Sequence, residues 1–267
     1  DEERAIVSPI AGTTRDAIDT NVVIGDKTYT LIDTAGIRRR HKEKEHVGKF
    51  SYMRTQLAIE RSDLCLVVLD AQSGITTEEK KIISMIEDAK KSCILLFNKW
   101  DLVKGFRMEH CLKGIELEIP FAAHCPKIFI SATSKRNIEK IFPAVEETLA
   151  SQSARISTGR LNKMLMASMQ KYHPPAIKGK RLRVYYMAQV TTKPPHFVLF
   201  VNSASLMAPS YKRYLVNEIR DNFQFNGIPL ILTLRSKDKD FTAKRGLAQK
   251  GRHIDRDLGT IQQVAEE

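Results

Sequence analysis

The sequence predicts an α/β domain, in which helices cover a parallel sheet, followed by a smaller α+β domain. In residues 1–150, short apolar runs alternate with helical stretches, which is typical of a parallel sheet wrapped by helices. The pattern changes after residue 150, and so does the charge: residues 1–150 hold 23 basic and 23 acidic residues, whereas residues 151–267 hold 20 basic and 8 acidic ones. A neutral domain beside a strongly basic one indicates a domain with its own chemistry joined to a module that binds a polyanion. A merely solvated basic surface is the alternative.

The first domain, residues 1–150, begins with a predicted hairpin, in which Thr20–Ile24 and Tyr29–Ile32 flank a turn at 25–27. Three continuous apolar runs predict strands that are covered on both faces: Leu64–Leu69, Cys93–Phe97 and Lys127–Ile130. Helices are expected at Tyr52–Arg61, Thr77–Lys91 and Ile138–Leu149. In such a sheet, ligands bind beyond the carboxyl ends of the strands.

The second domain follows a predicted linker at residues 151–157 and spans residues 158–234. Its pattern predicts the order α-β-β-α-β, with a first helix at Gly159–Tyr172 and a second that begins at Pro209 and ends at Gly227. In the first strand, Arg183, Tyr185 and Met187 are expected on the polar side. Residues 235–267 are polar and basic, so we expect a disordered tail.

Composition excludes several classes of protein. The longest strongly apolar run, Leu64–Leu69, is far shorter than the ~20 residues that span a bilayer. The first residues lack the features of a secretory signal, and four scattered cysteines do not form a disulfide framework. We therefore expect a cytoplasmic protein with no membrane contact.

Two polar clusters predict a phosphate and magnesium site. Asp33-Thr34-Ala35-Gly36 follows a predicted strand, where an aspartate can hold Mg²⁺ through water and a glycine lets a backbone N–H approach a terminal phosphate. Upstream, the hydroxyls of Thr13 and Thr14 can complete the magnesium shell. We expect Thr14 and Asp33 to be the magnesium ligands.

Two further clusters predict a guanine site. After the strand at Cys93–Phe97 comes Asn98-Lys99-Trp100-Asp101, in which the Asp101 carboxylate can accept hydrogen bonds from the N1–H and the 2-amino group of guanine. The Lys99 stem can lie over the base. After Lys127–Ile130 come Ser131 and Ala132, whose backbone N–H groups can meet the guanine oxygen. Adenine lacks these two donors, which disfavours an ATPase.

These motifs, together with Ala58–Asp63 and Ser210–Leu215, resemble the carboxyl-terminal part of the Der (EngA) family of bacterial ribosome-assembly GTPases, over residues 1 to about 234. The resemblance implies a P-loop GTPase-type parallel sheet followed by a KH-like domain. It also implies that the protein binds and hydrolyses GTP as a switch, needs Mg²⁺ and K⁺, acts in assembly of the large ribosomal subunit, and is a monomer. The charged run at residues 38–45 lies where such proteins carry a nucleotide-sensitive switch.

The chain departs from a GTPase at its phosphate loop. No GxxxxGK[ST] sequence occurs in the 267 residues, and the strand, loop and helix that carry it in the family are missing. The missing strand is central in the family's sheet, so its loss should leave a gap of ~10 Å between two unpaired edges. We expect this chain alone to bind GTP very weakly and to be inactive. Ile37 stands where Ras-like GTPases have a glutamine, as in the family, and we assign no catalytic residue.

The second domain lacks the GxxG loop with which KH domains grip single-stranded RNA, as the family also does. Basic residues remain, and they can bind the RNA backbone or dock the GTPase domain. The candidates for RNA contact are Lys178, Lys180, Arg181, Arg183, Lys212 and Arg213.

Two other functions compete with an RNA-associated GTPase. One is a non-hydrolysing adaptor that binds RNA or the ribosome, the literal interpretation of a chain without a phosphate loop. The other is a tRNA-modifying GTPase, which shares the motifs at residues 12–16 and 33–36. Its family places the GTPase domain inside a helical domain, so the α-β-β-α-β ending argues against it.

Overall fold

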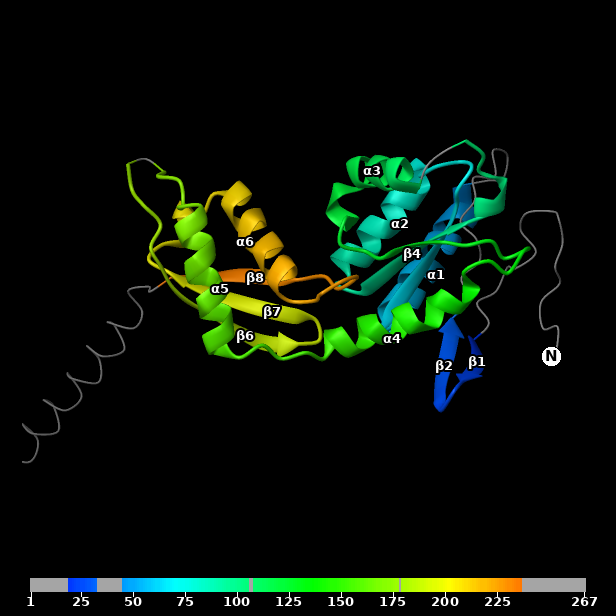
Figure 1. The fold of residues 1–267 in the computed structure, drawn as a ribbon, viewed down its shortest axis with the longest axis horizontal. Helices are drawn as coiled ribbons and strands as arrows, with labels where there is room; N and C mark the ends of the chain where they lie inside the picture. The colour runs from blue at the N-terminus through cyan, green and yellow to red at the C-terminus, as the bar shows by residue number, and fades with distance from the viewer. Residues whose placement is uncertain (1–18, 33–44, 106–107, 178, 237–267) are drawn as a thin grey trace, which may run out of the picture. The chain divides into compact units, whose positions relative to one another are not determined.

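The computed structural model describes residues 19–32, 45–105, 108–177 and 179–236, and of residues 45–51 only the backbone. The chain divides into two compact units (Figure 1). The first unit holds the residues up to Ala154 together with Thr191–Pro195 and Phe223–Leu230. The second holds Arg155–Val190, His196–Asn222 and the residues from Ile231 onward.

The first unit contains two sheets. Strands β1 (Asp19–Ile24) and β2 (Lys27–Ile32) form the predicted antiparallel hairpin, and the turn is Gly25-Asp26. Strands β3 (Leu64–Asp70), β4 (Ser92–Asn98) and β5 (Lys127–Phe129) pair in parallel in the order β3-β4-β5, which confirms all three predicted apolar strands. Among the described residues, no strand joins the hairpin to the larger sheet.

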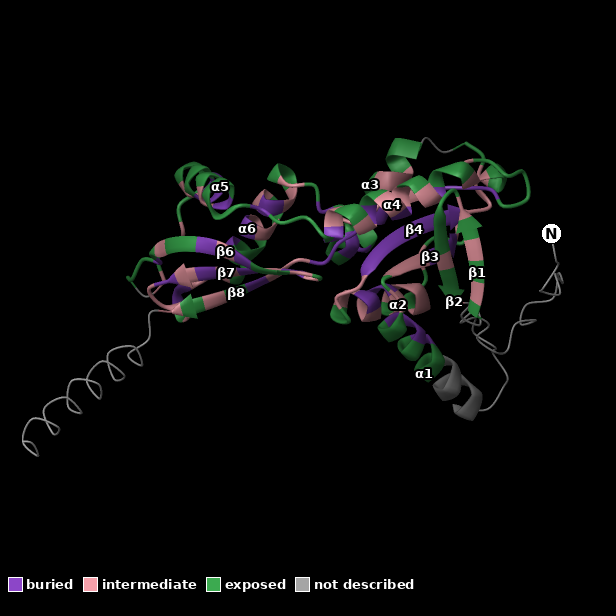
Figure 2. Cartoon of the chain, turned by 90° about the horizontal axis from the view of Figure 1, so that it is seen from below, coloured by how far each residue is buried: buried purple, intermediate pink, exposed green. Residues whose placement is uncertain are grey.

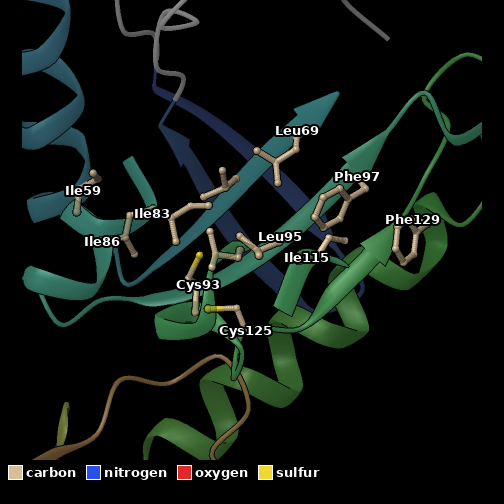
Figure 3. Packing of buried hydrophobic residues seen from close by; sticks show 13 residues of the cluster. Ile59, Leu69, Ile83, Ile86, Cys93, Leu95, Phe97, Ile115, Cys125 and Phe129 are labelled. Atoms are coloured by element: carbon tan, nitrogen blue, oxygen red, sulfur yellow. The ribbon is translucent and has the colours of Figure 1, made fainter. Parts of the chain in front are cut away.

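Strand β4 is buried on both faces (Figure 2) because helices cover both sides of the sheet. Cys93, Leu95 and Phe97 point into one apolar cluster, and Ile94 and Leu96 point into another. The first cluster includes residues from helices α1 (Glu45–Arg61), α2 (Thr77–Asp88) and α3 (Met108–Glu118) (Figure 3). The second cluster includes residues from α4 (Ile141–Gln152). The α2 helix begins with a capping box between Thr76 and Glu79, which satisfies two free backbone N–H groups.

Helix boundaries in this unit differ from the prediction. Helix α1 begins at Glu45 rather than Tyr52, α2 ends at Asp88 rather than Lys91, and α4 continues to Gln152, inside the segment expected as a linker. Helix α3 was not predicted. Its sequence carries an internal glycine, Gly114, which weakens the helical signal, and packing of Ile115 into the core stabilises it.

The second unit has the predicted order of elements. These are α5 (Thr158–Lys171), β6 (Val184–Thr192), β7 (Pro195–Val201), α6 (Pro209–Asn222) and β8 (Ile231–Ser236). The strands form one sheet in the order β6-β7-β8, with β7 and β8 parallel. Helix α5 begins where the Ser157 hydroxyl accepts a hydrogen bond from the Arg160 N–H. Phe197, Leu199 and Val201 of β7 form the buried face.

Two predictions for this part of the chain are wrong. Met187 is fully buried, whereas Tyr186 is 44% exposed, so the polar side of β6 is not the side that carries Met187. Helix α6 ends at Asn222, and Gly227 lies five residues later in a segment that belongs to the first unit. There the Gly227 N–H donates to the His124 oxygen and the Gly227 oxygen accepts from the Cys93 N–H, both at 2.8 Å. Gly227 therefore anchors this segment to the start of β4.

Across residues 19–32, 45–105, 108–177 and 179–236, no helix is both long and apolar enough to cross a membrane. The predicted tail lies outside the described residues from 237 onward.

Candidate nucleotide-binding site

The candidate site lies where β3, β4 and β5 end. Because these strands are parallel, their carboxyl ends meet at one edge of the sheet. Asp70 at the end of β3 is directly opposite Asn98 at the end of β4. Ser131 and Ala132 follow β5 at the same edge.

The Asn98 side chain joins two of the predicted guanine-site segments. Its Oδ1 atom accepts hydrogen bonds from the N–H of Lys99 at 2.8 Å and from the N–H of Ala132 at 3.0 Å. The Trp100 N–H donates to the oxygen of Ile130 at 3.1 Å, which ties the same two segments together through the backbone. Asn98 and Lys99 are thus brought next to Ala132, which is 34 residues away from Asn98 in the sequence.

The loop after β5 is held at both ends. The Ser131 N–H donates to the Arg136 oxygen at 3.1 Å, and the fully buried Ser131 hydroxyl accepts from the Ser134 N–H. Asn137, in the left-handed region with φ 60°, donates from its side chain to the Phe129 oxygen at 2.8 Å. These bonds fix the loop, and therefore Ala132, before any ligand binds.

Lys99 forms an ion pair that the sequence reasoning missed. Its Nζ atom lies 2.6 Å from Oδ2 of Asp70, and Asp70 also accepts a hydrogen bond from the Gln72 N–H. The hydrogen bond from Lys99 is the main cause that holds the pKa of Asp70 below its usual value, against the opposing effect of burial. The sequence offered one indication of this pair: Asp70 ends an apolar strand, and parallel strands such as this one and the strand that ends at Asn98 bring their carboxyl ends to one edge of a sheet.

Asp101 is exposed in the short 3₁₀ turn Trp100–Leu102. The indole of Trp100 packs on Phe129, with ring centroids 4.4 Å apart, so the turn is anchored in the core while Asp101 stays accessible. The candidates on the phosphate side, Thr13, Thr14, Asp33, Thr34, Ala35 and Gly36, lie outside the described residues, as does the charged run up to residue 44.

The candidates for RNA contact lie in the second unit. Lys180, Arg181 and Arg183 are exposed and precede β6 rather than lie in it, and Lys212 and Arg213 are exposed on α6. Lys178 lies outside the described residues. The Asn202 side chain donates to the Arg181 oxygen and accepts from the Arg183 N–H, so it holds the backbone of the basic segment 180–183 against the end of β7.

Comparison with known proteins assigns both parts of the chain. Residues 1–99 match the model of a family described as 50S ribosome-binding GTPase, and residues 155–235 match the KH-domain-like, carboxyl-terminal domain of EngA bacterial GTPase enzymes. These matches agree with the predicted GTPase-type sheet and the KH-like α+β domain.

Several individual relatives of this chain are named GTPase Der. The chain is 56% identical to GTPase Der of Protochlamydia amoebophila, over 90% of this chain and 49% of that protein. It is 42% identical to GTPase Der of Ruminiclostridium cellulolyticum, over 90% and 55%, and 43% identical to GTPase Der of Alkaliphilus oremlandii, over 88% and 54%. The chain spans about half the length of these relatives. The predicted motifs, the described fold and both domain matches agree, and they confirm the predicted resemblance of this chain to the carboxyl-terminal part of the Der (EngA) family.

Proposed function

We propose that this chain forms the guanine-recognising part of a GTP-hydrolysing switch and carries a basic KH-like domain that contacts ribosomal RNA. One observation supports the guanine-recognising role. The Asn98 side chain accepts hydrogen bonds from the backbone N–H groups of both Lys99 and Ala132, and the exposed carboxylate of Asp101 follows in the same segment as Lys99. The Asp101 carboxylate accepts hydrogen bonds from the N1–H and the 2-amino group of guanine. The Lys99 stem lies beside the base, and the fixed loop at Ala132 closes the other side of the pocket.

The phosphate end of the site rests on residues 13–14 and 33–36. Thr14 and Asp33 offer a hydroxyl and a carboxylate oxygen, a donor set that fits Mg²⁺, which prefers oxygen ligands. Mg²⁺, when bound, neutralises charge on the β- and γ-phosphates. A potassium requirement is proposed from the family alone. Since no phosphate loop is present in the sequence, no residue of this chain is assigned a catalytic role.

The second half of the proposal concerns the ribosome. The basic KH-like domain and the match of residues 1–99 to a family described as 50S ribosome-binding support a cytoplasmic role in assembly of the large subunit. Some basic residues of the KH-like domain could instead dock the GTPase domain. The alternative function is that of a non-hydrolysing adaptor that binds RNA or the ribosome.

The test exchanges the base that is recognised. In a chain completed by a segment with a GxxxxGK[ST] loop, Asp101→Asn should weaken binding of guanosine diphosphate and strengthen binding of xanthosine diphosphate, because an amide can donate to the added oxygen of xanthine. We expect a change in relative affinity of about 100-fold, measured by competition with fluorescent GDP, since a buried unpaired polar group costs 1–3 kcal/mol on each nucleotide. Asp88→Asn, at the end of α2, is the matched control. Unchanged selectivity in the Asp101 variant would mean that the base pocket lies elsewhere.

A further inference from the structure

The sheet of the second unit has one covered face and one open face. Along β7, Phe197, Leu199 and Val201 are fully buried, whereas the alternate residues His196, Val198 and Phe200 are only half-buried. Helices α5 and α6 lie together on one side of this sheet in both views (Figures 1 and 2). On the other side, no described element of this unit covers the strands.

A row of three side chains crosses this open face, one from each strand. Tyr186 of β6 stacks on Phe200 of β7, with ring centroids 4.2 Å apart and an interplanar angle of 14°. Phe200 pairs in register with Arg235 of β8, whose guanidinium carbon lies 6.0 Å from the Phe200 ring centroid. The row thus stacks a tyrosine, a phenylalanine and a cation in sequence.

The end of the row at Tyr186 is accessible. Tyr186 is 44% exposed, and β6 is an edge strand in the order β6-β7-β8. One face of the Tyr186 ring packs on Phe200. The other face points away from β7, toward the outer edge of the sheet, where no described strand pairs with β6. Val190, on the same face of β6, is 47% exposed and extends the apolar surface. A flat ring can stack there without displacing any contact of the row.

The charge of this part of the chain is almost entirely of one sign. Residues 151–236 contain thirteen basic residues but only two acidic ones, Glu218 and Asp221. Both acidic residues are on α6, which packs on the covered face, and Glu218 is engaged by Lys171 and Ser168. The basic segment 180–183 leads directly into β6, and Asn202 holds it at the end of β7, two residues beyond Phe200.

We propose that this open face binds single-stranded RNA, with a base stacked on Tyr186 and the flanking phosphates on the basic segment 180–183. The proposal rests on the proposed contact of the basic domain with RNA and specifies its form, namely unpaired bases rather than backbone charge alone. An exposed aromatic ring beside a basic segment is how proteins bind single strands without a strict sequence preference. A protein partner fits less well, since it would have to supply acidic side chains to match the basic segment as well as an apolar surface to match the row.

The test separates stacking from charge by using two probes with the same phosphates. Binding of the whole chain to a fluorescein-labelled oligoadenylate of about twelve nucleotides is compared with binding to an abasic oligoribonucleotide of equal length. We expect the oligoadenylate to bind at least about fivefold more tightly, and Tyr186→Leu to remove that difference while leaving the abasic affinity unchanged. Tyr186→Phe, which keeps the ring, should behave like the original chain.

Two further variants complete the design. Tyr172→Leu alters another exposed tyrosine, which packs on Tyr214 away from the sheet, and should leave both affinities unchanged. Replacing Lys180, Arg181 and Arg183 with glutamine should weaken the binding of both oligonucleotides by the same factor. Circular dichroism confirms that each variant is folded.

The outcomes are distinct. If the chain binds both probes equally and Tyr186→Leu changes neither affinity, the stacking proposal is wrong while RNA binding by charge stands, and the open face is left for a protein partner. If neither probe binds, both the stacking proposal and the RNA half of the proposed function are overturned.

Discussion

At the scale of single residues, the candidate site depends on side chains that fix the backbone before a ligand arrives. Lys99 adopts the left-handed conformation with φ 61°, which costs a non-glycine residue about 1 kcal/mol or more. Two contacts hold it there: its own N–H donates to Asn98, and its Nζ pairs with Asp70. Residues held in this conformation by polar contacts often lie at ligand-binding sites, which agrees with the proposed role of the Lys99 segment.

The Asp70 pair should be measurable as stability that depends on pH. Asp70→Asn removes the charge partner of the half-exposed Lys99, so we expect a loss of about 0.5–1 kcal/mol in the free energy of unfolding at neutral pH. The pKa of Asp70 is lowered in the folded state, so this stabilisation is present above the pKa of the unfolded carboxyl and is lost as the pH falls through the folded value. Urea unfolding followed by fluorescence of Trp100, the single tryptophan, measures it.

A double-mutant cycle provides the control for this pair. Lys99→Gln should cost a similar amount, and the double variant should cost little more than either single one. Full additivity of the two losses, or a loss from Asp70→Asn that persists at pH values where Asp70 is protonated, would contradict the assignment.

At the scale of elements, the segment from Phe223 to Leu230 depends on one glycine. Gly227 has φ +71°, and a Cβ there would lie 2.7 Å from the Cys93 oxygen and 2.9 Å from Cδ of Pro126. We expect Gly227→Ala to lower the free energy of unfolding of the first unit by about 2–4 kcal/mol, from backbone strain and from the clash together. Trp100 lies in the same unit and reports its unfolding.

Gly74 is the matched control for this substitution. It has φ +68°, close to that of Gly227, but nothing lies within 4 Å of a Cβ placed there. Gly74→Ala should therefore cost only the backbone strain, about 1–2 kcal/mol. Equal losses in the two variants would show that the contact of Gly227 with Cys93 and Pro126 contributes nothing.

The same elements show how far the sequence could predict the structure. Strand β4 was predictable because burial on both faces leaves a continuous apolar run, and Asn98 at its end followed from the parallel sheet. The inward face of β6 was not, because Tyr186 and Met187 are both large and apolar enough for a core, and packing alone decides between them. The sequence around Gly227 predicts a helix end, but its role is set by Cys93 and His124, which are both more than a hundred residues away. The Asp70 pair likewise required the register of two strands.

At the scale of the whole molecule, the separation of charge predicts how the chain binds RNA. Neutralising phosphates releases counterions, so affinity falls steeply with salt in proportion to the number of contacts. With about four of the candidate cations engaged, affinity should fall by about 100-fold between roughly 50 and 300 mM salt. Filter binding or anisotropy of the whole chain measures it, and substitution of Lys212 and Arg213 by glutamine reveals whether α6 contributes to the slope. An affinity that stays constant over this range, or no binding, argues that these cations serve another partner.

Addition of a phosphate loop should strengthen nucleotide binding by the first unit. A guanine pocket by itself contacts only the base, whereas most of the affinity of such sites comes from backbone N–H groups and a lysine around the β- and γ-phosphates. No GxxxxGK[ST] sequence is present in this chain, and the hairpin β1–β2 and the sheet β3-β4-β5 are not joined by a described strand. Adding a strand–loop–helix segment that carries this motif should therefore both complete the sheet and supply the phosphate contacts. We expect fluorescent GDP to bind at least about 100-fold more tightly to the extended chain, with a parallel rise in the unfolding midpoint reported by Trp100.

A control segment, in which the motif lysine is replaced by alanine, should raise the unfolding midpoint but not the affinity for GDP. The control thus separates the effect of the added strand from the effect of the added phosphate contacts. Equal micromolar affinity with and without the segment would mean that Asn98, Asp101 and their neighbours hold the nucleotide by a different geometry.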